Sequence, residues 1–413
     1  MSVREKRTVV VVGAGPSGAL VSALLQARGH DVLVVEKAHF PRFSIGESLL
    51  PHCMSFLAEA GMDAAVNGAG FQFKNGAAFC RGELQAEFDF TDKFTAGPGT
   101  TFQVQRGPFD KLLADEAAAQ GVEIRYGHEV QSLTLLEQGA QMMVVSDQGE
   151  RYQLDCDFVL DASGFGRVLP RLLELERPSD FPCRQAIFTH IADGIEPDSS
   201  DFDRDKILIT VHPQYQDVWF WLIPFSDGRA SLGVVAESTR FADGPEDLTE
   251  ALKAWVQDTP SLANVLSRAR FDTPVNTLRG YSADVTTLGD HRFALLGNAG
   301  EFLDPVFSSG VTIALKSASL AAAALDRQLR GDTVDWLADY AVPLQRGVKA
   351  FKTYVSAWYD GRFQQVVFHP NPTSSIKQMI SAILAGYAWD ESNPYVAESE
   401  RRLNALVAVC EDH

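Results

Sequence analysis

The sequence has little cysteine and no long apolar run. Its 413 residues include five cysteines, scattered without the spacing of metal ligands, and an odd number argues against a disulfide framework. No segment approaches the roughly 18 uninterrupted apolar residues of a membrane span. The start of the chain, MSVREKR, is too polar for a signal peptide. We therefore expect a cytoplasmic protein with reduced thiols.

Positive charge and histidine are also scarce. The chain has 36 Lys and Arg against 54 Asp and Glu, a formal net charge of −18, so neither nucleic acid nor an anionic membrane is an expected partner. The nine histidines form no zinc motif such as H-E-x-x-H, and no metal site is expected. The apolar share of 46% is that of a globular protein, whose length suits two domains or one with insertions.

The first forty residues predict a dinucleotide-binding βαβ unit. The run VVVVGAGPSGAL places Gly13, Gly15 and Gly18 in the G-x-G-x-x-G spacing between a buried strand and a helix. These glycines allow a tight turn, the approach of a pyrophosphate and close packing of helix on strand. Glu36 follows Gly15 by 21 residues and ends the second strand, where a carboxylate accepts hydrogen bonds from ribose hydroxyls. A glycine turn without a ligand is the alternative, and the combination of elements disfavours it.

Later segments favour FAD over NAD as the dinucleotide. No second G-x-G-x-x-G unit follows, whereas residues 159–167 (VLDASGFGR) and 293–305 (FALLGNAGEFLDP) predict distant strand-and-turn elements that could hold a flavin. Arg106, at the start of a predicted helix, could pair with the pyrophosphate or lie exposed on the surface.

The two predicted domains interleave along the chain. Residues 183–240 predict long strands, and most of the chain beyond residue 310 is expected to be helical. We predict an FAD-binding domain of residues 1–80, 100–170 and 285–330, a β-sheet substrate domain of residues 81–99 and 171–284, and a helical C-terminal region of residues 331–413.

Residues 218–225, VWFWLIPF, place two tryptophans on one face of a predicted strand. Trp219 and Trp221 are two residues apart, and side chains alternate between the faces of a strand. Such a pair usually packs a sheet on a core.

Four motifs in order resemble the flavin-dependent halogenases, a branch of the FAD monooxygenase superfamily. They are GAGPSG, PRFSIGESLLP (41–51), W-x-W-x-I-P ending at Pro224, and F-x-x-P-x-x-S-x-G from Phe302 to Gly310. The resemblance spans about residues 5–320. It implies an α/β fold with a Rossmann-type FAD-binding domain of the aromatic hydroxylase (glutathione-reductase-like) class.

The same resemblance assigns the site residues. Lys74 would be catalytic, capturing hypohalous acid made at the flavin and delivering electrophilic halogen; a solvated strand lysine is the alternative. Trp219 and Trp221 would form a wall between flavin and substrate, and Ser309 and Gly310 would bind the halide with backbone N–H groups. The FAD would be held by Gly13, Ala14, Gly15, Ser17, Gly18, Glu36, Lys37, Arg42, Ser44, Ile45, Gly46, Arg106, Asp161, Asn298, Asp304, Pro305, Gly310 and Val311.

The chain departs from the family pattern in two places. Asn298 stands where the superfamily usually has aspartate, and Phe307 where tryptophan halogenases have glutamate. Free tryptophan is therefore not the expected substrate. We expect a phenol, pyrrole or indole, either free or on an acyl or peptidyl carrier protein, with chloride or bromide and with FADH2 from a separate flavin reductase. The alternative is an FAD-dependent monooxygenase or oxidoreductase that does not halogenate.

One segment runs against the acidic composition. Residues 344–377 contain five basic residues and one acidic residue, and Phe351, Tyr354 and Trp358 have the spacing of one helix face. The segment is either a core-facing aromatic stripe with a solvated basic back, or a docking face for an acidic carrier protein.

Overall fold

The N-terminal βαβ unit is the centre of a parallel sheet. The structure, a computed structural model, describes residues 3–196, 202–242, 244–281 and 284–411. β1 (Val3–Val12) lies between β2 (Val32–Glu36) and β10 (Arg151–Asp161) and is parallel to both. The valines of β1 from Val9 to Val12 are buried, as a parallel strand covered on both faces requires.

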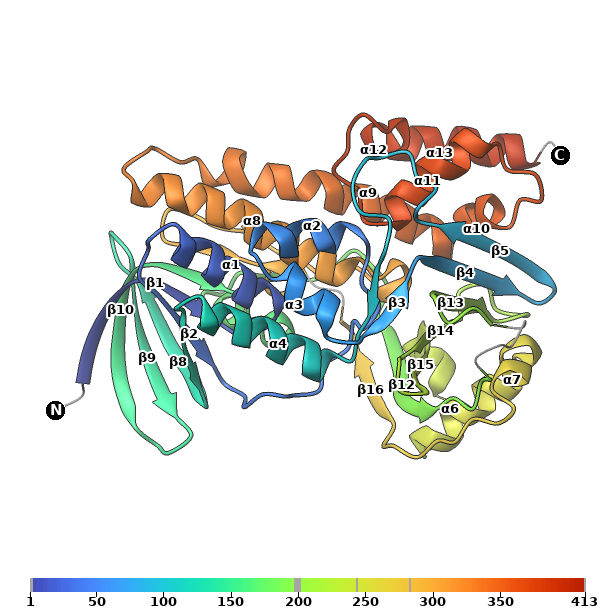
Figure 1. The fold of residues 1–413 in the computed structure, drawn as a ribbon, viewed down its shortest axis with the longest axis horizontal. Helices are drawn as coiled ribbons and strands as arrows, with labels where there is room; N and C mark the ends of the chain where they lie inside the picture. Colours follow the sequence, from blue (N-terminus) through green and yellow to red (C-terminus); the bar gives the residue numbers. More distant parts are fainter. Residues whose placement is uncertain (1–2, 197–201, 243, 282–283, 412–413) are drawn as a thin grey trace.

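Further strands extend this sheet on both sides. β7 (Glu123–Tyr126) pairs with β2, while β9 (Ala140–Ser146), β8 (His128–Leu135) and β18 (Phe293–Leu295) lie on the β10 side. The helices packed near it are α1 (Pro16–Ala27), α2 (His52–Glu59), α3 (Asp63–Gly68), α4 (Arg106–Ala119), α5 (Val168–Leu172) and α8 (Ser309–Leu329). Figure 1 shows α1 between α8 and α4.

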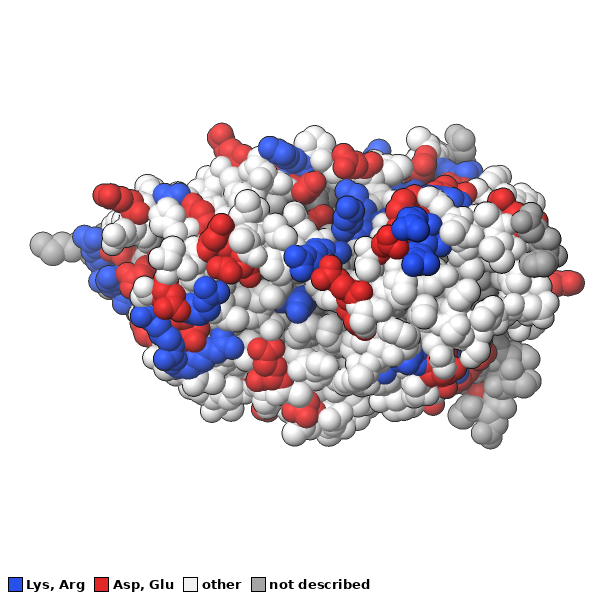
Figure 2. All heavy atoms as spheres, turned by 90° about the horizontal axis from the view of Figure 1, so that it is seen from above, with Lys and Arg blue, Asp and Glu red and all other residues white. Residues whose placement is uncertain are grey.

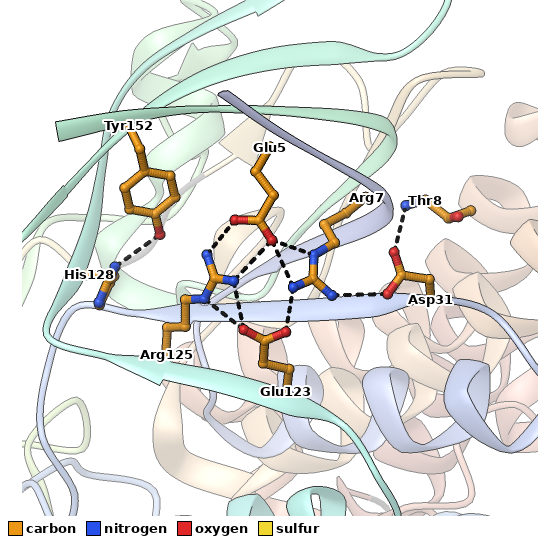
Figure 3. A network of polar contacts seen from close by, with 8 residues as sticks. All are labelled: Glu5, Arg7, Thr8, Asp31, Glu123, Arg125, His128 and Tyr152. Atoms are coloured by element: carbon orange, nitrogen blue, oxygen red, sulfur yellow. Dashed lines mark hydrogen bonds and ion pairs between the residues drawn. The ribbon is translucent and has the colours of Figure 1, made fainter. Parts of the chain in front are cut away.

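A network of ion pairs joins the strands at one edge of this sheet (Figure 3). Arg125 of β7 donates to both carboxylate oxygens of Glu5 in β1, at 2.8 and 3.0 Å. Arg7 contacts Glu5, Glu123 and Asp31. The hydrogen bond from Arg125 lowers the pKa of Glu5 to about 2. The network therefore favours the ionised form and holds β1 and β7 in register across β2.

A second sheet of seven strands carries the long central segment. Its order is β16 (Asn276–Arg279), β12 (Arg184–Ala192), β15 (Arg229–Glu237), β14 (Trp219–Pro224), β13 (Lys206–Val211), β4 (Gly76–Arg81) and β5 (Leu84–Asp89). Two small sheets flank it, formed by β3 (Gln72–Lys74) with β6 (Thr101–Gln103) and by β11 (Glu176–Arg177) with β17 (Asp284–Val285). Helices α6 (Leu248–Gln257) and α7 (Pro260–Val265) pack on the outer face.

The C-terminal region is helical and lies across the top of the molecule in Figure 1. Its helices are α9 (Val342–Tyr359), α10 (Arg362–Val367), α11 (Ser374–Leu384), α12 (Pro394–Ala397) and α13 (Ser399–Glu411). The predicted α/β fold with a second sheet and a helical C-terminal region is confirmed. No helix within the described ranges is both long and apolar enough to cross a membrane.

The aromatic stripe of α9 faces the core. Phe351, Tyr354 and Trp358 are at most 1% exposed. Three of the five basic residues in this segment are ion-paired within the chain: Arg346 with Glu391, Lys352 with Asp180, and Arg362 with Asp360 and Glu400. The core-facing alternative is therefore correct for the aromatic residues, and much of the basic charge is compensated.

Candidate functional site

A cavity of about 640 Å³ lies between the parallel sheet and the second sheet. It extends from the glycine turn after β1 to the tryptophans of β14 and the N-terminus of α8. It therefore brings together segments that are nearly 300 residues apart in the sequence.

The glycine turn has the geometry that its sequence predicts. Gly13 has a φ of +100°, and a Cβ there would lie 2.6 Å from the carbonyl oxygen of Ala162. A Cβ on Gly18 would lie 1.9 Å from the carbonyl oxygen of Gly13. Helix α1 begins at Pro16, so its free N–H groups face the cavity and favour an anion. Gly13 and Gly18 are thus needed for the close packing of α1 and the turn on β1 and β10.

Glu36 lines the cavity beside the glycine turn. Its carboxylate accepts hydrogen bonds from the backbone N–H of Ala14 and of Ala38, each at 2.8 Å. Each oxygen has a further lone pair, because a carboxylate offers about four acceptor positions. Glu36 is therefore oriented by the backbone and can still accept from ribose hydroxyls.

Two arginines near the glycine turn share the buried carboxylate of Asp110, which Arg42 contacts at 3.2 Å. Arg106 forms a bidentate pair with Asp110, at 2.7 and 3.0 Å, and donates to the carbonyl oxygen of Ile45. Arg42 lies nearer the turn, since a Cβ on Gly15 would be 3.3 Å from its Nη2. Arg106 thus braces the segment at Ile45, and Arg42 is the more exposed guanidinium beside the glycine turn.

Most of the residues predicted to bind the cofactor line this cavity. They are Gly13, Gly15, Ser17, Glu36, Lys37, Arg42, Ser44, Ile45, Gly46, Arg106, Asn298, Pro305, Gly310 and Val311. Ala14, Gly18, Asp161 and Asp304 are not part of its lining. Asp161 accepts hydrogen bonds from the backbone N–H of Ser163 and of Leu169, so its carboxylate shapes the turn after β10.

Lys74 is fully buried beside the cavity. Its Nζ donates to Ser48 Oγ at 2.7 Å and to the carbonyl oxygen of Leu49 at 2.8 Å, and lies 5.5 Å from the ring centre of Phe90. Burial lowers the pKa of Lys74 to about 7, and no carboxylate among the described residues pairs with it. Ser48 lines the cavity, so a single hydroxyl connects the cavity to an amine that can be neutral near pH 7.

The two tryptophans form one wall of the cavity. Their rings point to the same face of β14, with centres 5.9 Å apart. Trp221 lies over Gly233 of β15, where a Cβ would be 2.2 Å from the indole, and its Nε1 donates to Ser231 Oγ at 3.0 Å. Trp219 donates to the hydroxyl of Tyr359 at 2.8 Å. Each indole is thus held by its own partner.

The turn before α8 lines the cavity at the same end as the tryptophans. Ser308 has a left-handed φ of +56°, and α8 begins at Ser309 with its N-terminus toward the cavity. Ser308 and Gly310 line the cavity, whereas Ser309 is buried and does not. Because N–H groups at the start of a helix favour anions, the turn can hold a halide.

A polar pair at the cavity, one member buried and the other partly exposed, was not predicted from the sequence. Glu47 lines it and lies 2.7 Å from His190 Nε2 of β12. Phe43 stacks on Phe188 of the same strand. The motif around residues 41–51 drew attention to this segment, but no local pattern links it to a strand more than 140 residues later.

The chain belongs to a family of FAD-binding proteins. Residues 6–347 match the family model described as "FAD binding domain". Among proteins of known activity, the chain is 27% identical to the 1H-pyrrole-2-carbonyl-[peptidyl-carrier protein] chlorinase of Pseudomonas fluorescens, covering 98% of this chain and 94% of that protein. It is 28% identical to the sulochrin halogenase of Aspergillus terreus, covering 82% and 66%.

Solved structures agree with this assignment. A flavoprotein/dehydrogenase from Cytophaga hutchinsonii is 40% identical, with a TM-score of 0.95 over 98% of this chain and 99% of that one. The flavin-dependent brominase Bmp2 is 25% identical, with a TM-score of 0.84 over 99% and 100%. The resemblance to flavin-dependent halogenases is confirmed, and the chain is an FAD-binding enzyme of that kind.

Proposed function

We propose that the chain is an FADH2-dependent halogenase that uses O2 and chloride or bromide to halogenate an electron-rich aromatic ring through Lys74. The observation that carries this proposal is the buried amine of Lys74, with a pKa of about 7, one hydroxyl away from the cavity. An amine that is neutral at working pH is a nucleophile, whereas an exposed lysine would be a spectator ammonium ion.

The cavity fits FAD. The glycine turn, the α1 N-terminus and Arg42 suit a pyrophosphate, and Glu36 suits a ribose. Bound FAD, in its reduced form, would supply the electrons that activate O2 and so oxidise the halide. With a single dinucleotide fingerprint, the chain would depend on a separate flavin reductase for FADH2.

The chain's own residues have separate tasks in this proposal. The N–H groups at Gly310 hold the halide, and the tryptophan wall keeps an organic ring away from the flavin while smaller species pass. Lys74 then reacts with hypohalous acid, releasing water and forming a haloamine, or holds the acid by a hydrogen bond. The halogen passes to the ring, and the displaced ring proton is lost.

A turnover assay with a matched variant tests the proposal. The protein is supplied with a generic flavin reductase, O2, bromide and a panel of phenols, indoles and pyrroles, including a pyrrole on a peptidyl carrier protein, and products are read by mass. Lys74→Met should lose at least 99% of product while keeping FAD affinity. Lys316→Met is the control, because burial also lowers the pKa of that lysine.

Three outcomes contradict the proposal. If Lys74→Met keeps a tenth of wild-type halogenation, the role of Lys74 is wrong. If the wild-type protein oxidises FADH2 and yields only hydroxylated products, it is a monooxygenase. If it yields only dehydrogenated products, it is a dehydrogenase, which is the name given to the Cytophaga hutchinsonii relative.

A further inference from the structure

A directed chain of hydrogen bonds connects the tryptophan wall to the turn before α8. Trp219 Nε1 donates to the hydroxyl of Tyr359 at 2.8 Å, and that hydroxyl donates to Asp304 Oδ2 at 2.9 Å. An indole N–H can only donate, so the hydroxyl proton of Tyr359 must point to Asp304. The chain therefore has one possible direction, from β14 through the end of α9 to residue 304.

Asp304 is the buried end of this chain. Its Oδ2 also accepts from the hydroxyl of Tyr281 at 3.2 Å, and its Oδ1 accepts from the backbone N–H of Val306 at 3.1 Å. The carboxylate is 3% exposed and begins the turn that leads to Ser308 and α8. A movement of Asp304 would therefore move the anion-binding turn itself.

Arg184 stabilises the same cluster from the second sheet. Its guanidinium carbon lies 3.3 Å from the ring centre of Tyr359, a cation–π contact, and its side chain is buried. Burial raises the pKa of Asp304 to about 6, and the charge of Arg184 opposes that rise. Near neutral pH, Asp304 is thus ionised and accepts all three side-chain and backbone donors.

We propose that Tyr359 is a positioning residue that fixes the indole of Trp219 against the turn before α8. By holding the indole there, Tyr359 keeps the tryptophan wall open to the smaller species and closed to an organic ring. This inference rests on the proposed function for its consequence in catalysis. It assigns a task in the reaction to the last residue of α9, which lies in the helical C-terminal region outside the cavity lining.

The same helix provides a matched control. Tyr354 of α9 is buried, and its hydroxyl forms one hydrogen bond, to the carbonyl oxygen of Tyr395 at 2.8 Å. Tyr354→Phe removes an equivalent hydroxyl from the same helix without touching the wall. Tyr359→Phe keeps the ring that stacks on Arg184 and removes only the link between Trp219 and Asp304.

The first measurement requires no catalysis. In protein labelled with 5-fluorotryptophan, the resonance of Trp219 is assigned from its loss in Trp219→Phe, and 19F spectra of the FAD-loaded variants are compared at equal folded fraction. Tyr359→Phe should shift or broaden the Trp219 resonance and leave that of Trp389 unchanged. Tyr354→Phe should leave the Trp219 resonance in place. An unchanged Trp219 resonance in Tyr359→Phe overturns the proposal.

The second measurement is the ratio of halogenated product to FADH2 consumed. Tyr359→Phe should lower this ratio at least threefold, with FAD affinity unchanged, while Tyr354→Phe keeps the wild-type ratio. If this ratio falls equally in both variants, or falls in neither, the positioning role is overturned. If the wild-type protein makes no halogenated product, the proposed function has failed, and the 19F comparison still decides whether Tyr359 holds Trp219.

Discussion

At the scale of single residues, burial changes the protonation of Lys74 and, through it, the stability of the protein. Its folded pKa of about 7 is below the usual 10.5. Between these values the unfolded chain binds one more proton than the native protein, so stability rises with pH. The same desolvation that frees the amine therefore makes the protein less stable in acid.

This effect can be measured against Lys74→Met, which removes the titrating group and keeps most of the volume. We expect the difference in unfolding free energy, wild type minus variant, to rise by about 1.4 kcal/mol per pH unit between pH 8 and 10 and to level off below pH 6. Urea denaturation across this range checks it. Parallel curves for the two proteins would mean that Lys74 titrates as an exposed lysine.

Gly233 is a second residue whose effect is local and specific. Its missing Cβ makes room for Trp221, which a Cβ would approach to 2.2 Å. Gly233→Val should cost about 1–3 kcal/mol of stability, the usual penalty for overpacking. In the Trp221→Leu background the same substitution should cost close to nothing, and a denaturant double-mutant cycle measures the difference. Equal costs in both backgrounds would show that the indole does not need this space.

At the scale of elements, we expect two glycines of the first βαβ unit to have different roles, Gly15 in FAD binding and Gly18 in folding. A Cβ on Gly15 would meet the flexible end of Arg42 at 3.3 Å and Asp110 Oδ2 at 4.0 Å, whereas a Cβ on Gly18 would meet the backbone of Gly13 at 1.9 Å. Gly15→Ala should therefore fold with a Tm within a few degrees of wild type and bind FAD at least tenfold more weakly.

Gly18→Ala should instead lower the Tm markedly or prevent folding, because strand and helix can no longer approach. Thermal melts without FAD and FAD titrations distinguish the two effects. Full FAD affinity in Gly15→Ala would place the pyrophosphate elsewhere in the cavity.

The elements also show what the sequence could predict. The glycine turn and Glu36 were predictable because strand, turn and acid are contiguous, and the two tryptophans because alternation in a strand is a local rule. The pairs Glu47–His190 and Trp219–Tyr359 were not, since their members are 143 and 140 residues apart. Asp161 and Asp304 were assigned to the cofactor from motif position, yet the structure gives both carboxylates partners within the chain.

At the scale of the whole molecule, charge decides which partners can approach. The formal net charge is −18, and Figure 2, which views the face with α8 and α9, shows basic and acidic side chains interspersed. Arg346 is 59% exposed and paired with Glu391, and Lys349 is exposed nearby on α9. If an acidic carrier protein docks at this part of α9, these two residues are the ones that would attract it.

We expect Arg346→Glu/Lys349→Glu to slow turnover of a carrier-bound pyrrole at least threefold at low salt and to leave a free phenol unaffected. Arg401→Glu/Arg402→Glu makes the same change in net charge on α13 instead of α9, and should have a smaller effect. Steady-state rates at two ionic strengths compare the variants. Equal effects of both variants would mean that only the overall charge matters, and no effect of either would favour a free small molecule as substrate.

The link from Trp219 to Tyr359 also has a consequence during synthesis of the chain. The ribosome delivers β14 about 140 residues before the hydroxyl that holds its indole. The cavity can begin to form once β1, β10 and β18 are present, but its wall acquires its final arrangement only when α9 has emerged and packed. A nascent chain therefore passes through a stage in which the nucleotide end is built and the wall is still loose. The order of emergence delays completion of the reactive end until the scaffold around it exists.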